Sequence, residues 1–87
     1  MREDIIEILC EINPLLDPED EDMSIAEFLE SKQLMELIVT LEDKFDVDIP
    51  YDERNEDNFE SVDTIIQLLE SLEWLLIKYY SQKMHII

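Results

Sequence analysis

Three stretches of the sequence repeat apolar side chains at intervals of three and four residues, and this spacing constrains the fold more than any other feature of the chain. It places the apolar side chains of each stretch along one face of an α-helix. The apolar positions are Ile5, Ile8, Leu9 and Ile12 in the first stretch, Leu34, Leu37, Ile38, Leu41 and Phe45 in the second, and Val62, Ile65, Ile66, Leu69, Leu72 and Leu76 in the third. The first stretch predicts a helix over residues 2–12, and the second predicts a helix that ends near Phe45, because Ile49-Pro50 requires an extended backbone.

The polar segments between these stretches predict loops. Residues 13–22 form one loop, and residues 51–60 are expected to form another with a short helical turn, from which Phe59 reaches into the core. Ser61 is expected to cap the last helix. No stretch alternates apolar and polar residues for long enough to predict a β-sheet. The pattern therefore predicts an all-α fold, a small bundle of three to four helices, and the length of 87 residues suits one domain with a modest core.

The last 14 residues differ in charge from the rest of the chain. All 24 acidic residues lie within residues 1–73, whereas Lys78 and Lys83 are the only charged residues of 74–87. This divides the chain into a helical bundle over 1–73 and an apolar C-terminal extension over 74–87. We expect the extension to continue the last helix and to fold its apolar face onto the bundle. The alternative is an exposed surface through which two copies associate weakly.

The acidic composition restricts the partners of the chain. With 24 acidic and 6 basic residues, the formal net charge is −18, which disfavours nucleic acid and membrane insertion and favours proteins with a basic face. The hydrophobic fraction of 46% indicates a folded protein despite this charge. The N-terminal residues have no long apolar run, so neither a secretory signal nor a transmembrane helix is expected, and a cytoplasmic location is the expectation.

The residue types needed for most kinds of catalysis are scarce. The chain has no glycine, which removes the phosphate-binding loop, the dinucleotide fingerprint and the calcium-binding EF-hand. His85 is the only histidine and lies near the end of the chain, while Cys10 stands alone and is expected at the core or its boundary. No metal site and no nucleophile–base pair are predicted. The chain is therefore expected not to be an enzyme, but a binding or carrier module.

Residues 30–50, ESKQLMELIVTLEDKFDVDIP, resemble the second-helix signature of acyl carrier proteins. That signature runs Asp-Ser-Leu, an apolar and acidic helix with Glu-Leu, then Leu-Glu-Glu-x-Phe and a final Ile-Pro. The matching positions, without a gap, are Ser31, Glu36-Leu37, residues 41–45 and residues 47–50. Residues 55–70, NEDNFESVDTIIQLLE, are similar to the corresponding segment of stand-alone aminoacyl and D-alanyl carriers. With the first helix, the resemblance extends over residues 2–72.

The resemblance implies an acyl-carrier-like bundle and a specific covalent modification. A phosphopantetheinyl transferase would move 4′-phosphopantetheine from coenzyme A to Ser31, and acyl or aminoacyl groups would then be carried as thioesters on its thiol. A helix N-terminus is a favourable place for the resulting phosphodiester. A loading ligase and downstream acyl-transfer enzymes with basic docking surfaces are the other implied partners. The residues expected to contact these partners are Glu30, Lys32, Glu36, Glu42 and Asp43.

Three alternatives remain at this point. Ser24-Ile25-Ala26-Glu27 fits a capping box, and a helix that begins there and continues into the second apolar stretch would enclose Ser31. The residue after Ser31 is Lys32 where the signature has an apolar residue, which favours a second hypothesis, an unmodified carrier-fold module that binds proteins through its acidic surface. An unrelated acidic helical binding protein is the third.

Overall fold

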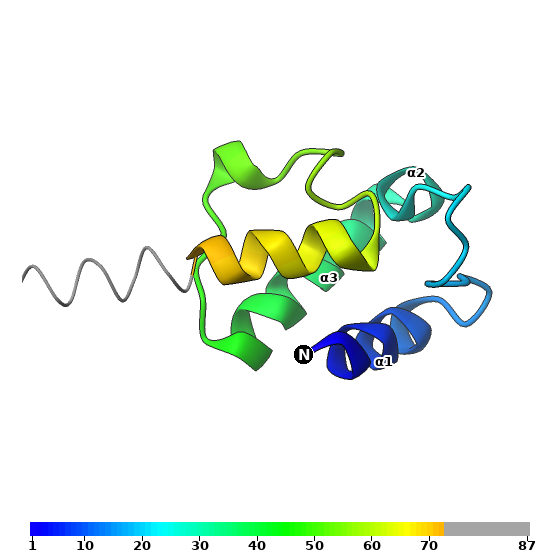
Figure 1. Ribbon diagram of the computed structural model, residues 1–87, viewed down its shortest axis with the longest axis horizontal. Helices are drawn as coiled ribbons and strands as arrows, with labels where there is room; N and C mark the ends of the chain where they lie inside the picture. Colours follow the sequence, from blue (N-terminus) through cyan, green and yellow to red (C-terminus); the bar gives the residue numbers. More distant parts are fainter. Residues whose placement is uncertain (73–87) are drawn as a thin grey trace, which may run out of the picture.

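The computed structural model describes residues 1–72, which contain helices and no strand (Figure 1). In chain order these are α1 (Arg2–Ile12), α2 (Ile25–Phe28), α3 (Ser31–Phe45), the 3₁₀ turn η1 (Tyr51–Glu53) and a last helix over residues 62–72. The predicted all-α fold is confirmed. The predictions about the extension over 74–87, including a helix continued through Leu76, lie outside the described residues.

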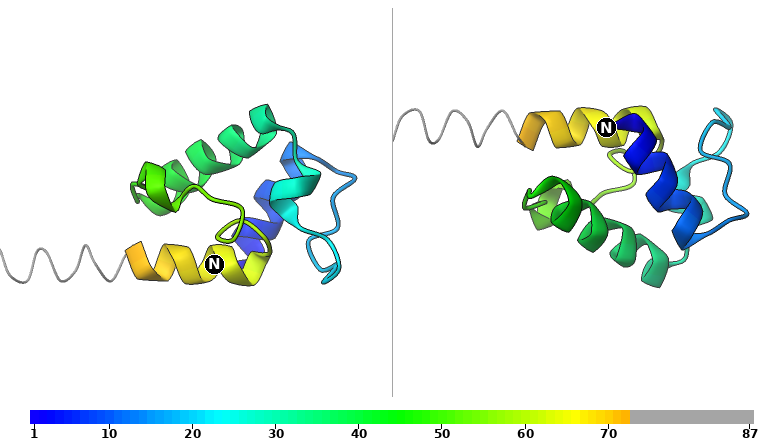
Figure 2. Two further views of the ribbon diagram at one scale, coloured as in Figure 1. Left: turned by 90° about the horizontal axis from the view of Figure 1, so that it is seen from above. Right: turned by 90° about the horizontal axis from the view of Figure 1, so that it is seen from below.

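The apolar stripes of the three long helices meet in one core. The views in Figure 2 show α1, α3 and the last helix lying around a common interior, and α1 packs on α3. The buried apolar side chains are Ile5, Ile8, Leu9, Leu16, Ile25, Leu29, Leu37, Ile38, Leu41, Ile49, Phe59, Val62, Ile65, Leu68 and Leu69. Most of them occupy the helical spacing seen in the sequence, so the hydrophobic effect selects this arrangement of the helices.

The loop before the last helix contributes Phe59 to the core and forms hydrogen bonds with the start of α2. Phe59 is fully buried, as predicted. The Ile25 and Ala26 N–H groups, at the start of α2, donate to the carbonyl oxygens of Glu60 and Phe59 at 2.8 and 3.0 Å. These bonds satisfy two amides that a helix start leaves without an intrahelical partner. A segment more than thirty residues away in the sequence therefore fixes the position of α2.

Ser61 caps the last helix, as its position predicted. Its Oγ accepts the Thr64 N–H at 3.2 Å, and the Ser61 N–H donates to Thr64 Oγ1 at 3.0 Å. This reciprocal pair satisfies two amides at the start of the helix in the manner of a capping box. Cys10 differs from its prediction, because it lies exposed on α1 and not at the core boundary.

Candidate functional site

Ser31 is the first residue of α3, and the backbone immediately before it is extended. Leu29 and Glu30 have ψ angles of 141° and 158°, which end α2 after Phe28 and separate it from α3. The alternative of one helix through Ser31 is therefore wrong. Ser24 does precede a helix, but its side chain makes no capping hydrogen bond and that helix is only four residues long. The buried Leu29 side chain is anchored in the core between the two helices.

The Ser31 side chain is exposed, and within residues 1–72 its hydroxyl makes no hydrogen bond. Other hydroxyls are engaged: Thr40 Oγ1 donates to the Glu36 carbonyl at 2.7 Å, while Ser61 and Thr64 cap the last helix. Ser24 is half-buried. Ser71 is exposed but lies more than two turns into the last helix and not at its start. Ser31 therefore combines an accessible hydroxyl with a helix N-terminus, which none of these others does.

The start of α3 is suited to a negatively charged group. The Leu34 N–H donates to the Glu30 carbonyl at 2.9 Å, and Gln33 Oε1 accepts the Glu30 N–H at 3.3 Å, so two hydrogen bonds join Glu30 to the first turn. That turn contains Lys32 and no acidic residue. The 15 residues of α3 align their peptide dipoles with the positive end at Ser31. A phosphodiester on Ser31 Oγ would meet backbone N–H groups at this end.

Four of the five residues expected to contact partners are exposed, two of them next to Ser31 and two farther along α3. Glu30 lies directly before the serine, and Lys32, Glu36 and Asp43 follow it along α3. The last three are spaced four and seven residues apart, which places them on one face of the helix.

Glu42, the fifth residue, is half-buried and holds the segment that follows α3. Its Oε2 accepts the Ile49 N–H at 3.0 Å and lies 3.7 Å from an Arg54 guanidinium nitrogen. Arg54 also donates from Nε to the Ile49 carbonyl at 3.0 Å. Glu42 and Arg54 therefore bind both backbone polar groups of the fully buried Ile49. From its place on the helix Glu42 was expected to be a surface acid, but its Oε2 oxygen is engaged inside the molecule.

Two exposed apolar side chains next to Ser31 were missed by the sequence reasoning. Met35 and Val39 are 49% and 59% exposed, and they lie one and two helical turns after Ser31 on the same side of α3. With Lys32, Glu36 and Thr40 they line a shallow depression of about 460 Å³. The signal was present in the sequence, because positions 35 and 39 fall outside the apolar stripe that α3 turns to the core.

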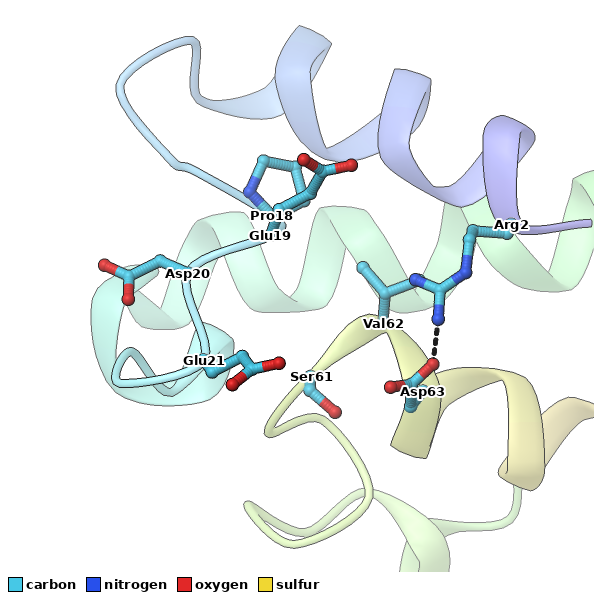
Figure 3. Close-up of a pocket in the computed structure, with 8 residues that line it drawn as sticks. All are labelled: Arg2, Pro18, Glu19, Asp20, Glu21, Ser61, Val62 and Asp63. Carbon is cyan, nitrogen blue, oxygen red and sulfur yellow. Dashed lines mark hydrogen bonds and ion pairs between the residues drawn. The ribbon is translucent and has the colours of Figure 1, made fainter.

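A smaller hollow of about 210 Å³ lies between the starts of α1 and the last helix (Figure 3). An ion pair between Arg2 and Asp63 joins the two helices there. The hollow is lined by Arg2, Pro18, Glu19, Asp20, Glu21, Ser61, Val62 and Asp63, none of which was a predicted site residue. In the described part of the chain no group of acidic, histidine or cysteine side chains is placed to hold a metal ion. No helix among residues 1–72 has the length and apolar character needed to cross a membrane.

Comparison with protein families decides the class of the molecule. The family model described as "Phosphopantetheine attachment site" matches residues 3–70, which include α3 and Ser31. The chain belongs to the phosphopantetheine-binding carrier proteins. The carrier is 32% identical over 74 residues to the D-alanyl carrier protein of Leuconostoc citreum (strain KM20), covering 83% of this chain and 95% of that protein. It is 33% identical over 69 residues to that of Streptococcus gordonii (strain Challis), covering 77% and 87%. No solved structure matches the chain.

The family match confirms the predicted class, function and cofactor. The molecule is a carrier protein with covalently attached 4′-phosphopantetheine, and its cargo is held as a thioester on that group. The exposed hydroxyl at the start of α3 fits such a modification sterically and electrostatically. The matched span ends before the C-terminal extension over 74–87.

Proposed function

We propose that Ser31 is the attachment residue and that the carrier transports an aminoacyl group, with D-alanine as the leading candidate. One observation carries the first part: Ser31 is the hydroxyl residue of the matched segment that is both exposed and placed at the N-terminus of a long helix. The relatives named as D-alanyl carrier proteins support the second part.

The modification uses chemistry that the transferase supplies. Ser31 Oγ attacks the phosphorus next to the pantetheine of coenzyme A and forms a P–O bond. The bond from that phosphorus to the bridging oxygen breaks, and adenosine 3′,5′-bisphosphate leaves. In this proposal a base of the transferase takes the hydroxyl proton. The carrier contributes the nucleophile and a helix N-terminus that favours the phosphodiester.

Cargo is loaded by a second enzyme in this proposal. An ATP-dependent ligase activates the amino acid as an adenylate, and the pantetheine thiol displaces AMP to give the thioester. Loading with D-alanine, L-alanine, glycine and short fatty acids can be compared by the mass of the intact carrier. A ligase encoded beside this carrier should load D-alanine in preference to its mirror image, and loading with fatty acids alone would overturn the choice of cargo.

The exposed face of α3 is the proposed docking surface for these enzymes. Glu30, Lys32, Glu36 and Asp43 are exposed there, and the acidic members suit a basic rim on a partner. Charges at such a rim chiefly raise the association rate, which suits a carrier that must leave each enzyme quickly. Replacing Glu36 with Lys should lower kcat/KM of loading several-fold with little change in kcat, and an unchanged kcat/KM would remove Glu36 from the interface.

A cytoplasmic location and weak self-association complete the proposal. The second rests on the sequence of residues 74–87, which has apolar and aromatic residues with two lysines, whereas the preceding residues are strongly acidic. Sedimentation of the full chain and of a chain truncated after Glu73 tests it. We expect a concentration-dependent increase in mass for the full chain, and identical monomers would contradict self-association.

The central test is the mass of the intact protein after incubation with coenzyme A and a promiscuous phosphopantetheinyl transferase. The wild-type chain should gain about 340 Da, the mass of the cofactor group that is transferred. The Ser31→Ala variant should gain nothing, whereas Ser71→Ala, which removes another exposed hydroxyl, should gain the full mass. If the wild-type chain gained no mass with several transferases, the unmodified protein-binding module would take the place of this proposal.

A further inference from the structure

Lys32 stands out on the surface that surrounds Ser31. It is exposed at the second position of α3, and none of the carboxylates within residues 1–72 lies within ion-pair distance of it. Glu36 follows it by one helical turn, yet the two side chains form no ion pair. Within the described part of the chain Lys32 therefore presents a positive charge without an ion-pair partner, beside the hydroxyl that is to be modified, on a protein with a net charge of −18.

The apolar part of the same surface is close to Lys32. Met35 lies three residues after Lys32 and four after Ser31, so its side chain is a neighbour of both on the helix surface. Val39 extends the apolar strip by another turn. Lys32, Met35 and Val39 together line the shallow depression on α3. Any protein surface that covers Ser31 closely also covers the ammonium group and this apolar strip.

The enzyme that modifies Ser31 has to make that close approach. Its active site holds coenzyme A so that the phosphorus to be attacked comes within about 3 Å of Ser31 Oγ. Adjacent Cα atoms are about 3.8 Å apart, so the exposed Lys32 lies directly beside this contact. A ligase acts instead on the thiol at the end of the pantetheine arm and is not required to touch Lys32. The constraint therefore falls on one partner, the phosphopantetheinyl transferase.

We propose that the transferase specific for this carrier has a carboxylate that pairs with Lys32, and beside it an apolar patch that contacts Met35. This inference rests on the proposed modification of Ser31. The physical reason is the cost of removing an unpaired ammonium from water, which a carboxylate offsets and an apolar pocket does not. Lys32 then selects the cognate transferase by charge. Basic groups elsewhere on the transferase meet the acidic residues farther along α3, so the complementary surface alternates in sign.

The test is steady-state transfer of phosphopantetheine by the host's own transferase to the full-length carrier, followed by intact mass. Lys32→Glu should lower kcat/KM on the order of 10-fold or more, because a close attractive pair becomes a repulsive one. Lys32→Met keeps the length of the side chain and removes the charge, and it should give a smaller decrease that shrinks at high salt. Lys44→Glu is the matched control: it lies on the same helix, about 18 Å farther along, and should change kcat/KM less than twofold.

Folding does not confound this comparison. In Lys32→Glu the gain from a negative charge near the positive end of the helix dipole opposes repulsion from Glu36 one turn away, so the variant should melt close to the wild-type temperature. Replacing the paired carboxylate of the transferase with Lys should restore activity toward Lys32→Glu. A wild-type kcat/KM for Lys32→Glu, or a higher kcat/KM for Lys32→Met, would overturn the inference about Lys32. Either result would leave the proposed modification of Ser31 standing, because Ser31 would still be modified. If the wild-type chain were not modified at all, both this inference and the carrier proposal would fail.

Discussion

Glu42 is predicted to act mainly through the stability of the fold, and Glu42→Ala tests this directly. The substitution removes the acceptor of the Ile49 N–H and the carboxylate next to Arg54. Ile49 is fully buried, so its N–H has no compensating contact with water. The Arg54 side chain keeps its bond to the Ile49 carbonyl but loses its ionic partner. We therefore expect a loss of stability that no surface acid of the same helix would cause.

The magnitude follows from these two contacts. A hydrogen bond to a charged acceptor is worth about 1.5–3 kcal/mol. The pair with Arg54 adds less than about 1 kcal/mol, because the two side chains keep 27% and 23% of their exposure to solvent. Glu42→Ala should thus lower the free energy of unfolding by about 2–3 kcal/mol, and each kcal/mol corresponds to about 4–8 °C in Tm for a domain of this size. Glu42→Gln keeps an oxygen that can accept the Ile49 N–H and should lose about 1 kcal/mol.

Urea unfolding followed by circular dichroism measures these differences, with Glu36→Ala as the matched control. Glu36 is exposed on the same helix and its carboxylate makes no ion pair within residues 1–72, so its loss should change stability by less than about 0.5 kcal/mol. Loading assays should rank the two positions the other way from the stability measurements. Glu36→Gln should lower kcat/KM of loading more than Glu42→Gln does. Equal stability of Glu42→Ala and Glu36→Ala would refute the assignment and return Glu42 to the docking surface.

Three further substitutions test the rest of the fold by the same unfolding measurement. Asp46 has a φ of 51°, in the left-handed region, and follows α3 at its negative end, so Asp46→Gly should raise the stability by about 1 kcal/mol, and a decrease would contradict this account. Phe59→Ala should cost about 3–5 kcal/mol and loosen α2, and a cost below that of an exposed residue would show that Phe59 lies outside the core. Ser61→Ala should cost about 1 kcal/mol, whereas Ser61→Asp, another good N-cap, should lose little; equal losses would speak against capping.

The helices could be predicted from the sequence because their cause is local. Each apolar stripe repeats at the helical period, so the sequence alone predicts that each helix buries its stripe against the other two. The bounds of α1 and the end of α3 agree with the pattern for this reason. Ser61 was equally accessible to prediction, since its capping partner Thr64 lies three residues away.

The break before Ser31 could not be decided from local sequence. The segment after Ser24 has the composition of a helix start, and its position depends on two hydrogen bonds to carbonyl oxygens of the loop around Phe59 and on the burial of Ile25 and Leu29. The role of Glu42 was hidden for the same reason, because its partners Ile49 and Arg54 are on a segment whose path depends on the tertiary fold. Position on a helix predicts which way a side chain points, but not what lies opposite it.

The attachment of phosphopantetheine at Ser31 is tested most directly on carrier purified from its native host. Proteolysis and tandem mass spectrometry of the peptide that spans the start of α3 should show an added mass of about 340 Da, the transferred cofactor group, on residue 31. Under the fragmentation conditions the pantetheine part should be ejected from that peptide alone. Unmodified Ser31 in the native protein, or the added mass on another hydroxyl such as Ser61, would contradict the account.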